Sequence, residues 1–171
     1  MATLHHNISG ELTQELLAPG DDITVSKISL VNIQKVSDCK VDLYIEKKLT
    51  GRFYLLKAVE IPKGASLIYE NPTRFSTATG EFGLYIKLTD GDTFTLTGSI
   101  DPTASTSLTG VNTLFLSEVS VGDEIVVSSE TRTVSTVITD LALTLTAATT
   151  DTANDTSPDC NPTALVDVII N

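Results

Sequence analysis

From Asp21 onward, apolar and polar residues alternate along most of the chain with the two-residue period of β-strands. The clearest case is residues 40–46, where Val41, Leu43 and Ile45 alternate with Lys40, Asp42, Tyr44 and Glu46. Such a strand belongs to a sheet with one buried and one solvated face. In residues 23–30 the alternation restarts out of phase after Val25, which predicts a bulge or short turn near Lys27.

The same alternation predicts further strands, which are separated by turn residues. Residues 53–61 and 67–69 are expected to be strands joined by the Pro62-Lys63-Gly64 turn. Residues 83–90 and 92–101 flank Gly91, and the Asp90-Gly91 pair is a strong hairpin signal. Beyond them, residues 113–119, 123–129, 131–139 and 141–147 predict four short strands, the size and rhythm of a small curled sheet or SH3-like barrel.

The last residues also alternate, since Val166, Val168 and Ile170 share one side, and a terminal strand needs a sheet to join. Two polar stretches that contain proline, residues 102–109 and 149–162, are expected to be linkers, the second exposed or partly disordered. We therefore expect residues 21–101 and 163–171 to form one β-domain and residues 110–148 to be inserted into it. Two tandem domains, with the last strand serving the second, are the alternative.

These patterns define the expected fold class as all-β. The main domain should be an antiparallel β-sandwich, either a jelly roll or immunoglobulin-like, with a small SH3-like β-barrel module inserted before the last strand.

Residues 1–20 allow two interpretations. The spacing of Leu12, Leu16 and Leu17 is compatible with a short helix that stops at Pro19-Gly20, and an extended arm that reaches a neighbouring subunit is the alternative. From position alone, we predict that both chain ends supply inter-subunit contacts, through Leu4, Leu12, Leu16, Leu17, Val166, Val168 and Ile170.

Composition narrows the classes of function. The 171 residues carry a net charge of −11, which disfavours nucleic-acid binding because affinity for phosphates comes from Lys and Arg. No stretch approaches the ~18 consecutive apolar residues of a membrane span, so neither nucleic acid nor membrane is an expected partner. The first residues lack the pattern of a secretory signal, and synthesis in the cytosol is the simplest expectation.

Candidate catalytic groups are scarce. The two histidines, His5 and His6, are adjacent in a segment expected to be mobile, where nothing would hold a general base against its target. No nucleophile-elbow, P-loop, dinucleotide-binding or HExxH motif occurs. We expect a protein that is not an enzyme and has no cofactor.

Simpler roles compete with metal ligation and with a disulfide for the acidic residues and the cysteines. Asp90-Gly91-Asp92 and the run Asp151, Asp155, Asp159 could supply oxygen ligands to Ca²⁺, but turn chemistry explains the first, and neither has the spacing of a calcium loop. Cys39 and Cys160 could pair, although two reduced, partly buried thiols are the favoured interpretation.

Aromatic residues make up 5% of the chain and include no Trp, a poor supply for stacking on sugars or bases. Tyr44 and Tyr85 are expected to point outward by alternation. At most one modest aromatic patch is expected, drawn from Tyr44, Phe53, Tyr54, Tyr69, Phe75, Phe82 and Tyr85.

Two runs resemble virion structural proteins of tailed bacteriophages, particularly marine and cyanobacterial ones. Residues 28–70 resemble a strand ending in Val-Asn, an alternating strand and a YLLK-IPxGxSL hairpin. The residues that carry this likeness are Leu30, Asn32, Val41, Leu43, Tyr54, Leu55, Leu56, Lys57, Val59, Ile61, Pro62, Gly64 and Leu67. Residues 113–148 resemble a small β-module, centred on VGDEIVV, found in many phage structural polypeptides.

The resemblance implies a non-enzymatic subunit of head decoration, neck, tail or baseplate. Such a subunit is located in the virion, is assembled in the host cytoplasm and works as a symmetric oligomer with other virion proteins such as the major capsid, neck or tail proteins. It also agrees with reduced cysteines. A host- or glycan-binding module on the particle is the alternative function.

Overall fold

The structure is a computed structural model that describes residues 3–47 and 51–171, and it divides into two compact units. Unit 1 comprises Met1–Ile33, Asp38–Asp90 and Ala164–Asn171, and unit 2 comprises Gln34–Ser37 and Gly91–Thr163. The chain thus leaves unit 1 for most of unit 2 after Asp90 and returns at Ala164.

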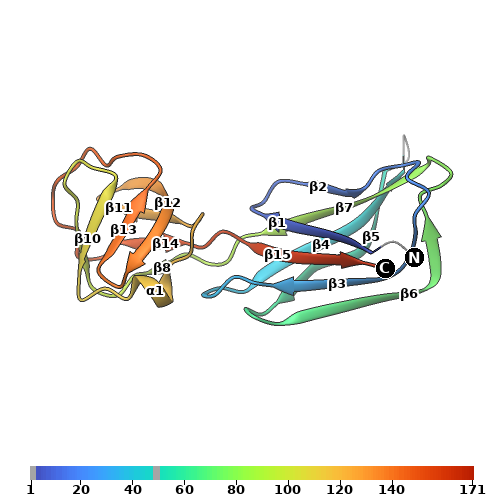
Figure 1. Ribbon diagram of the computed structural model, residues 1–171, viewed down its shortest axis with the longest axis horizontal. Coiled ribbons are helices and arrows are strands. Elements are labelled where there is room, and N and C mark those ends of the chain that lie inside the picture. The colour runs from blue at the N-terminus through green and yellow to red at the C-terminus, as the bar shows by residue number, and fades with distance from the viewer. Residues whose placement is uncertain (1–2, 48–50) are drawn as a thin grey trace. The chain divides into compact units, whose positions relative to one another are not determined.

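Unit 1 contains two four-stranded sheets (Figure 1). The first sheet has the order β1 (Leu4–Ser9), β15 (Leu165–Ile170), β3 (Thr24–Asn32) and β6 (Ser66–Ser76). The second has the order β2 (Gln14–Leu17), β7 (Phe82–Thr89), β4 (Cys39–Lys47) and β5 (Gly51–Ile61). Every neighbouring pair is antiparallel.

The strand order identifies the topology. If the eight strands of unit 1 are lettered B to I in chain order, the two sheets have the orders BIDG and CHEF, which is the arrangement of a jelly roll. The expected antiparallel β-sandwich is therefore confirmed, as a jelly roll and not an immunoglobulin-like fold.

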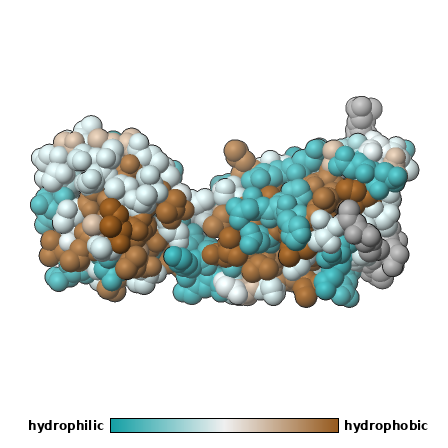
Figure 2. Space-filling view, in the orientation of Figure 1, coloured by the Kyte–Doolittle hydropathy of each residue, from teal (hydrophilic) through white to brown (hydrophobic). Residues whose placement is uncertain are grey.

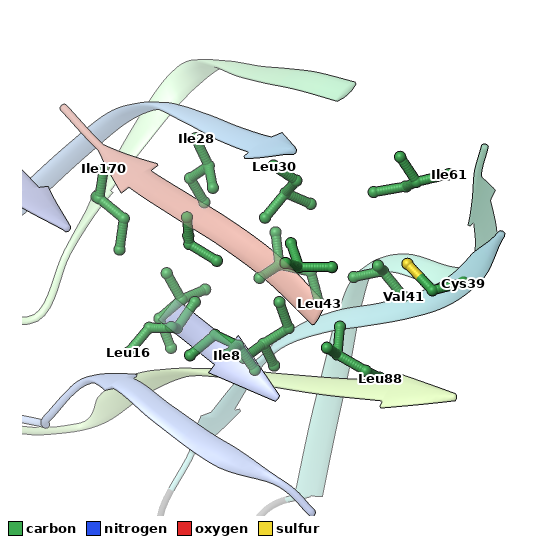
Figure 3. Packing of buried hydrophobic residues seen from close by; sticks show 14 of the residues in the cluster. Ile8, Leu16, Ile28, Leu30, Cys39, Val41, Leu43, Ile61, Leu88 and Ile170 are labelled. Atoms are coloured by element: carbon green, nitrogen blue, oxygen red, sulfur yellow. The ribbon is translucent and has the colours of Figure 1, made fainter. Parts of the chain in front are cut away.

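The core of unit 1 lies between these sheets, because each presents its apolar face to the other (Figure 3). Ile8, Ile28, Leu30 and Ile170 come from the first sheet, and Leu16, Val41, Leu43 and Leu88 from the second. The alternation predicted for residues 40–46 is confirmed, since Val41 and Leu43 are fully buried and Ile45 packs against the cluster.

The predicted bulge in residues 23–30 is also confirmed. The amides of Ser26 and Lys27 both donate to the carbonyl of Asn171, at 2.8 and 3.0 Å, so two residues of β3 oppose one residue of the C-terminal segment. Because the bulge shifts the phase, Val25 and Ile28 both point into the core.

The helix predicted near the N-terminus is wrong. Residues 4–9 and 14–17 are strands β1 and β2, which belong to different sheets and are joined through Gly10, at φ +72°. Hydrogen bonding to β15 and β7 overrides the helical spacing of Leu12, Leu16 and Leu17. The arm interpretation is also wrong for this segment, since Leu16 and Leu17 are buried within their own chain.

Two turn predictions need correction. The Pro62-Lys63-Gly64 turn does not close a hairpin, because β5 pairs with β4 and β6 pairs with β3 in the other sheet. Asp90-Gly91 is not a hairpin turn either, since the chain passes there from unit 1 to unit 2. The Asp90 carboxylate instead accepts the amide hydrogen of Ala164 at 2.6 Å, where the chain returns.

Unit 2 is built on a seven-stranded antiparallel sheet. Its order is β8 (Phe94–Thr95), β14 (Asp159–Asn161), β11 (Glu124–Val127), β12 (Glu130–Thr139), β13 (Ala142–Leu145), β10 (Ser107–Val111) and β9 (Ser99–Asp101). An isolated bridge joins Ile100 on edge strand β9 to Asp155, just before β14. The core contains Ile100, Leu108, Phe115, Ile125, Val134, Leu143 and Cys160 among others.

Unit 2 is larger than the predicted insert 110–148, and an SH3-like barrel is not confirmed. The predicted linker 102–109 contains the start of β10, and 149–162 contains β14 and the fully buried Cys160. Residues 113–119, predicted to be a strand, contain helix α1 (Phe115–Glu118). In β10 and β14, pairing with neighbouring strands compensates for a weak or polar sequence pattern.

Candidate interaction surfaces

Three tyrosines form a cluster on the outer face of the sheet β2-β7-β4-β5. Tyr44 stacks on Tyr85 with ring centroids 5.9 Å apart and meets the tilted ring of Tyr54 at 5.4 Å. The alternation correctly placed Tyr44 and Tyr85 on the outer face. Tyr44 is nevertheless only 1% exposed, since its neighbours cover it. Tyr69 packs against the core instead, and the side chain of Phe75 lies outside the described residues.

Two cations lie over this tyrosine cluster, and each is paired with a carboxylate. The Arg52 guanidinium is 4.7 Å from the Tyr44 ring centre and donates to Glu46 at 3.1 Å. Lys57 lies 4.2 Å from the Tyr54 ring centre, and its Nζ is 3.0 Å from the Asp42 Oδ2. Each of the two cations therefore contacts both a tyrosine ring and a carboxylate of the same sheet.

The acid–base properties of the cluster follow from these contacts. Burial, together with the hydrogen bond that the hydroxyl donates to Glu15, raises the pKa of Tyr85 to about 12. Burial alone would raise the pKa of Asp42, but the Ala58 amide and Lys57 outweigh it and lower that pKa. At neutral pH the Tyr85 phenol is therefore neutral, and Arg52 and Lys57 are each paired with a carboxylate.

Unit 2 carries a different surface, which we call the apolar patch. It consists of Val111, Leu114, Leu116, Ile138 and Leu141, whose side chains are all more than two-fifths exposed. Figure 2 shows apolar residues gathered on this unit in the region of α1. Contiguous exposed apolar surface is a feature of protein and membrane interaction sites and of ligand-binding grooves.

The turn between β12 and β13 positions the apolar patch. Asp140 accepts the amide hydrogens of Phe115, through its carbonyl at 3.4 Å, and of Leu116, through its carboxylate Oδ1 at 3.0 Å. These bonds cap the first turn of α1, and the buried ring of Phe115 anchors it. On the other side of the turn, the carbonyl of Leu141 accepts the amide of Gly110 at 2.9 Å. The backbone segments that carry Leu114, Leu116 and Leu141 are thus linked at the Asp140 turn.

Most residues predicted as inter-subunit contacts are occupied within their own chain. Leu16, Leu17, Val166, Val168 and Ile170 are buried in the core of unit 1, and Leu4 is half-buried against it. Leu12 is 81% exposed, so it alone among the seven offers its whole side chain. The residues of the apolar patch were not selected from the sequence. The signal was the apolar content of residues 111–116 and 138–141, which join or end elements of unit 2.

The histidines and aspartates weighed for chemistry lie in structural positions. His5 and His6 belong to β1, so the expectation of a mobile segment is wrong. Asp155 accepts the amides of Ser128 and Ser157, and Asp151 accepts that of Ala153, so these carboxylates hold turns. In residues 3–47 and 51–171, no group of three or more His, Cys, Asp or Glu is arranged to hold a metal ion.

Cys39 and Cys160 are both buried free thiols and belong to different units. Burial, with the charges of Asp38 and Asp90, raises the pKa of Cys39 to about 11. Burial, with the nearby Asp123, raises that of Cys160 to about 12. The raised pKa values keep both thiols protonated at neutral pH. No helix in the described part of the chain has the length and apolar character to cross a bilayer.

The fold defines the class of protein as an eight-stranded jelly roll with a second β-unit inserted before its last strand. No family model and no curated protein matches the chain.

Several solved structures are weakly similar. One is the structure of the Gx strain of infectious bursal disease virus, 9% identical with a TM-score of 0.28, which aligns with 99% of this chain and 32% of that one. The VP2 subviral particle of the same virus is 7% identical with a TM-score of 0.21, over 98% and 32% of the two chains. A serine protease of Aeromonas sobria is 9% identical with a TM-score of 0.26, over 100% and 27%.

The chain thus spans about a third or less of the length of each of these structures. The first two are virus particles and the third is an enzyme, and likenesses of this degree carry no argument about function.

Proposed function

We propose that this chain is a non-enzymatic structural protein of a virus particle, more narrowly of a tailed phage, which docks on the capsid, neck or tail as a symmetric oligomer. The observation that carries the proposal is the apolar patch of unit 2, because exposed apolar side chains are stabilised by burial against another protein. Each fully buried side chain of this kind contributes about 1.5–3 kcal/mol.

Two further observations support the proposal. Residues 28–70 and 113–148 resemble phage structural polypeptides. The jelly roll is also used by many viral capsid domains, which is an analogy at the level of fold. Nucleic acid and membrane are not partners in this proposal, because the net charge of −11 repels both phosphate and anionic lipid.

A charge placed in the apolar patch tests the proposal. We expect Leu116→Glu to prevent incorporation into particles, because docking would then bury an unpaired carboxylate. Ile68→Glu is the matched control, since Ile68 is 53% exposed on unit 1 and Leu116 is 51% exposed. The measurement is immunogold labelling of particles purified from the virus that encodes the chain, with a tag on both variants.

Particles should be labelled when they are made with tagged wild type or tagged Ile68→Glu. Tagged Leu116→Glu should remain outside the particles, in the soluble fraction, as a folded protein. Particles that contain no wild-type chain would overturn the virion role. Equal incorporation of both variants would overturn the apolar patch as the docking site.

A further inference from the structure

Strand β1 is an edge strand without the features that protect the other edges of the described sheets. β6 contains Glu70 and Pro72 and is out of register with β3 near Lys27, while β2 has only four residues and a register shift. β5 carries Arg52 and Lys57 and two register shifts, and β8 and β9 have two and three residues. Charges, bulges, prolines and short length are the devices that keep edges from pairing.

β1 by contrast pairs with β15 over six consecutive positions without a shift. Its sequence, LHHNIS, contains no proline and no acidic or lysine residue. Within the part of the chain that the structure describes, β15 is the one strand paired with β1. Among the described residues, the opposite side of β1 is therefore a regular edge without a paired strand, on which only the Ser9 carbonyl accepts a side-chain hydrogen bond, from Gln14 Nε2 at 3.2 Å.

The alternation of hydrogen bonds shows which groups this edge presents. The amide and carbonyl of Asn171 both form hydrogen bonds with Lys27 of β3. Successive residues of a strand bond to opposite sides, so the amides and carbonyls of the alternate residues point toward β1. These alternate residues are Ala164, Val166, Val168 and Ile170. The bond from the Gly10 amide to the Ala164 carbonyl, at 2.9 Å, agrees with this alternation. Consequently Leu4, His6 and Ile8 bond to β15, and the amides and carbonyls of His5 and Asn7 point away from the sheet.

We propose that β1 pairs antiparallel with β1 of a second copy of this chain about a twofold axis at His6. In this register His5 lies opposite Asn7 of the second copy, so the two outward amides and two outward carbonyls of each chain form a ladder of four hydrogen bonds. Leu4 lies opposite Ile8 of the second copy, on the core side of both sheets. The two four-stranded sheets become one continuous sheet of the dimer.

The side chains near the twofold axis favour a second copy of the chain as the partner of β1. His6 Nε2 is buried and, among the described residues, has no hydrogen-bond partner. At the axis the two His6 residues form a non-hydrogen-bonded pair, about 4.5 Å between Cα atoms, which brings the two imidazoles close to each other.

Charge favours the same occupant. A chain of net charge −11 repels its copy, yet β1 carries no carboxylate. The nearest one on β15, Asp167, accepts a hydrogen bond from Asn7 at 2.7 Å.

His5→Pro tests the pairing. It removes an amide hydrogen that points outward and adds a ring at the edge, while the bonds from Leu4, His6 and Ile8 to β15 remain. His5→Ser is the matched control, because it removes the same side chain and keeps the amide. Light scattering should give twice the chain mass of 18.2 kDa for wild type and His5→Ser, and 18.2 kDa for His5→Pro.

Hydrogen exchange of the wild type supplies a readout that needs no variant. The amides of His5 and Asn7 should be protected at concentrations where the dimer forms and should exchange freely after dilution. A wild type of 18.2 kDa at every concentration, a dimeric His5→Pro, or a dimer that leaves these two amides unprotected would each overturn the pairing.

The inference rests on the proposed function only in expecting a symmetric oligomer, and the two can fail separately. Leu116→Glu should still dimerise through β1. A chain that dimerises through β1 but is absent from virus particles overturns the virion role alone. A monomeric chain that is incorporated into particles overturns the β1 pairing alone.

Discussion

The two units use their apolar residues differently. Unit 1 packs two sheets face to face and buries 17 side chains in one cluster, including those of its N- and C-terminal strands. Unit 2 buries 11 around a single curled sheet and leaves the apolar patch exposed. The units also differ in net charge, and unit 2 is the more acidic. It has ten Asp and Glu and two basic residues, whereas unit 1 has twelve Asp and Glu and nine basic residues.

This contrast shows that hydrophobic content alone does not locate an interaction surface. In unit 1, Arg52 and Lys57 lie over the outward rings of Tyr44 and Tyr54, and each cation is paired with a carboxylate, while Phe53 stays 50% exposed. In unit 2, the exposed leucines of the apolar patch belong to a strongly acidic unit. The negative charge opposes nonspecific association, and a partner of complementary charge can still bury the patch.

The sharpest test of the comparison is a pair of identical core truncations, Leu43→Ala in unit 1 and Leu143→Ala in unit 2. Each removes a side chain that is at most 1% exposed, and each should cost about 2–5 kcal/mol. Alkylation measured by mass spectrometry reports the units separately, because Cys39 belongs to unit 1 and Cys160 to unit 2. Leu43→Ala should accelerate alkylation of Cys39 and Leu143→Ala that of Cys160. Equal acceleration of both thiols would show that the units unfold together.

A second test concerns the buried carboxylate of unit 2. Asp123 accepts hydrogen bonds from Gln34 Nε2 at 2.9 Å, the Thr163 amide at 3.0 Å and the Ser120 amide at 2.8 Å. Asp123→Ala leaves these donors without that acceptor and should cost about 1–3 kcal/mol or more, seen as a lower midpoint of unfolding in urea. Asp92→Ala removes the same charge from an exposed position and should change nothing. Identical behaviour of the two variants would contradict a structural role for Asp123.

Alkaline pH should weaken both units through their thiols. The native pKa values of about 11 and about 12 lie above the ordinary value of 9.0, so above pH 9 the unfolded chain releases protons that the native chain retains. Stability therefore falls as pH rises from 9 toward 11, by up to about 1.4 kcal/mol per pH unit for each thiol. Denaturant melts of wild type and Cys160→Ala should converge above pH 9. A constant difference across that range would contradict burial of the Cys160 thiol.

The smallest effect is expected at the tyrosine cluster. Lys57→Met removes an exposed cation from Asp42 and Tyr54, and solvent screening makes such pairs weak. The melting temperature should stay within experimental error of the wild type, with or without added salt. A clear, salt-sensitive drop would show that the outer face of unit 1 depends on its ions.

Much of unit 1 was predictable because its strands have strong local patterns. The alternation in β4 and β15 predicts which side chains face the core, and the phase change in β3 predicts the bulge. The outward positions of Tyr44 and Tyr85 follow from the same rule. Their contact with each other does not, because it depends on β4 lying beside β7.

The remaining errors lie in short segments whose conformation depends on distant partners. The leucines near β1 and β2 have a spacing that would fit a helix. The two segments are extended because they form backbone hydrogen bonds with β15 and β7. α1 forms because Asp140 caps it, and β14 forms inside a polar stretch because β11 pairs with it. The apolar patch combines residues 111–116 with 138–141, which are adjacent only after folding.

By itself, then, the sequence determined an all-β chain with antiparallel strands, because side-chain alternation is a local property. The tertiary structure decided the BIDG and CHEF order, the extent of unit 2, the open edge of β1 and the apolar patch. Each of these depends on which strands pair across long separations, and pairing is settled by hydrogen bonds and burial that no short stretch of sequence contains.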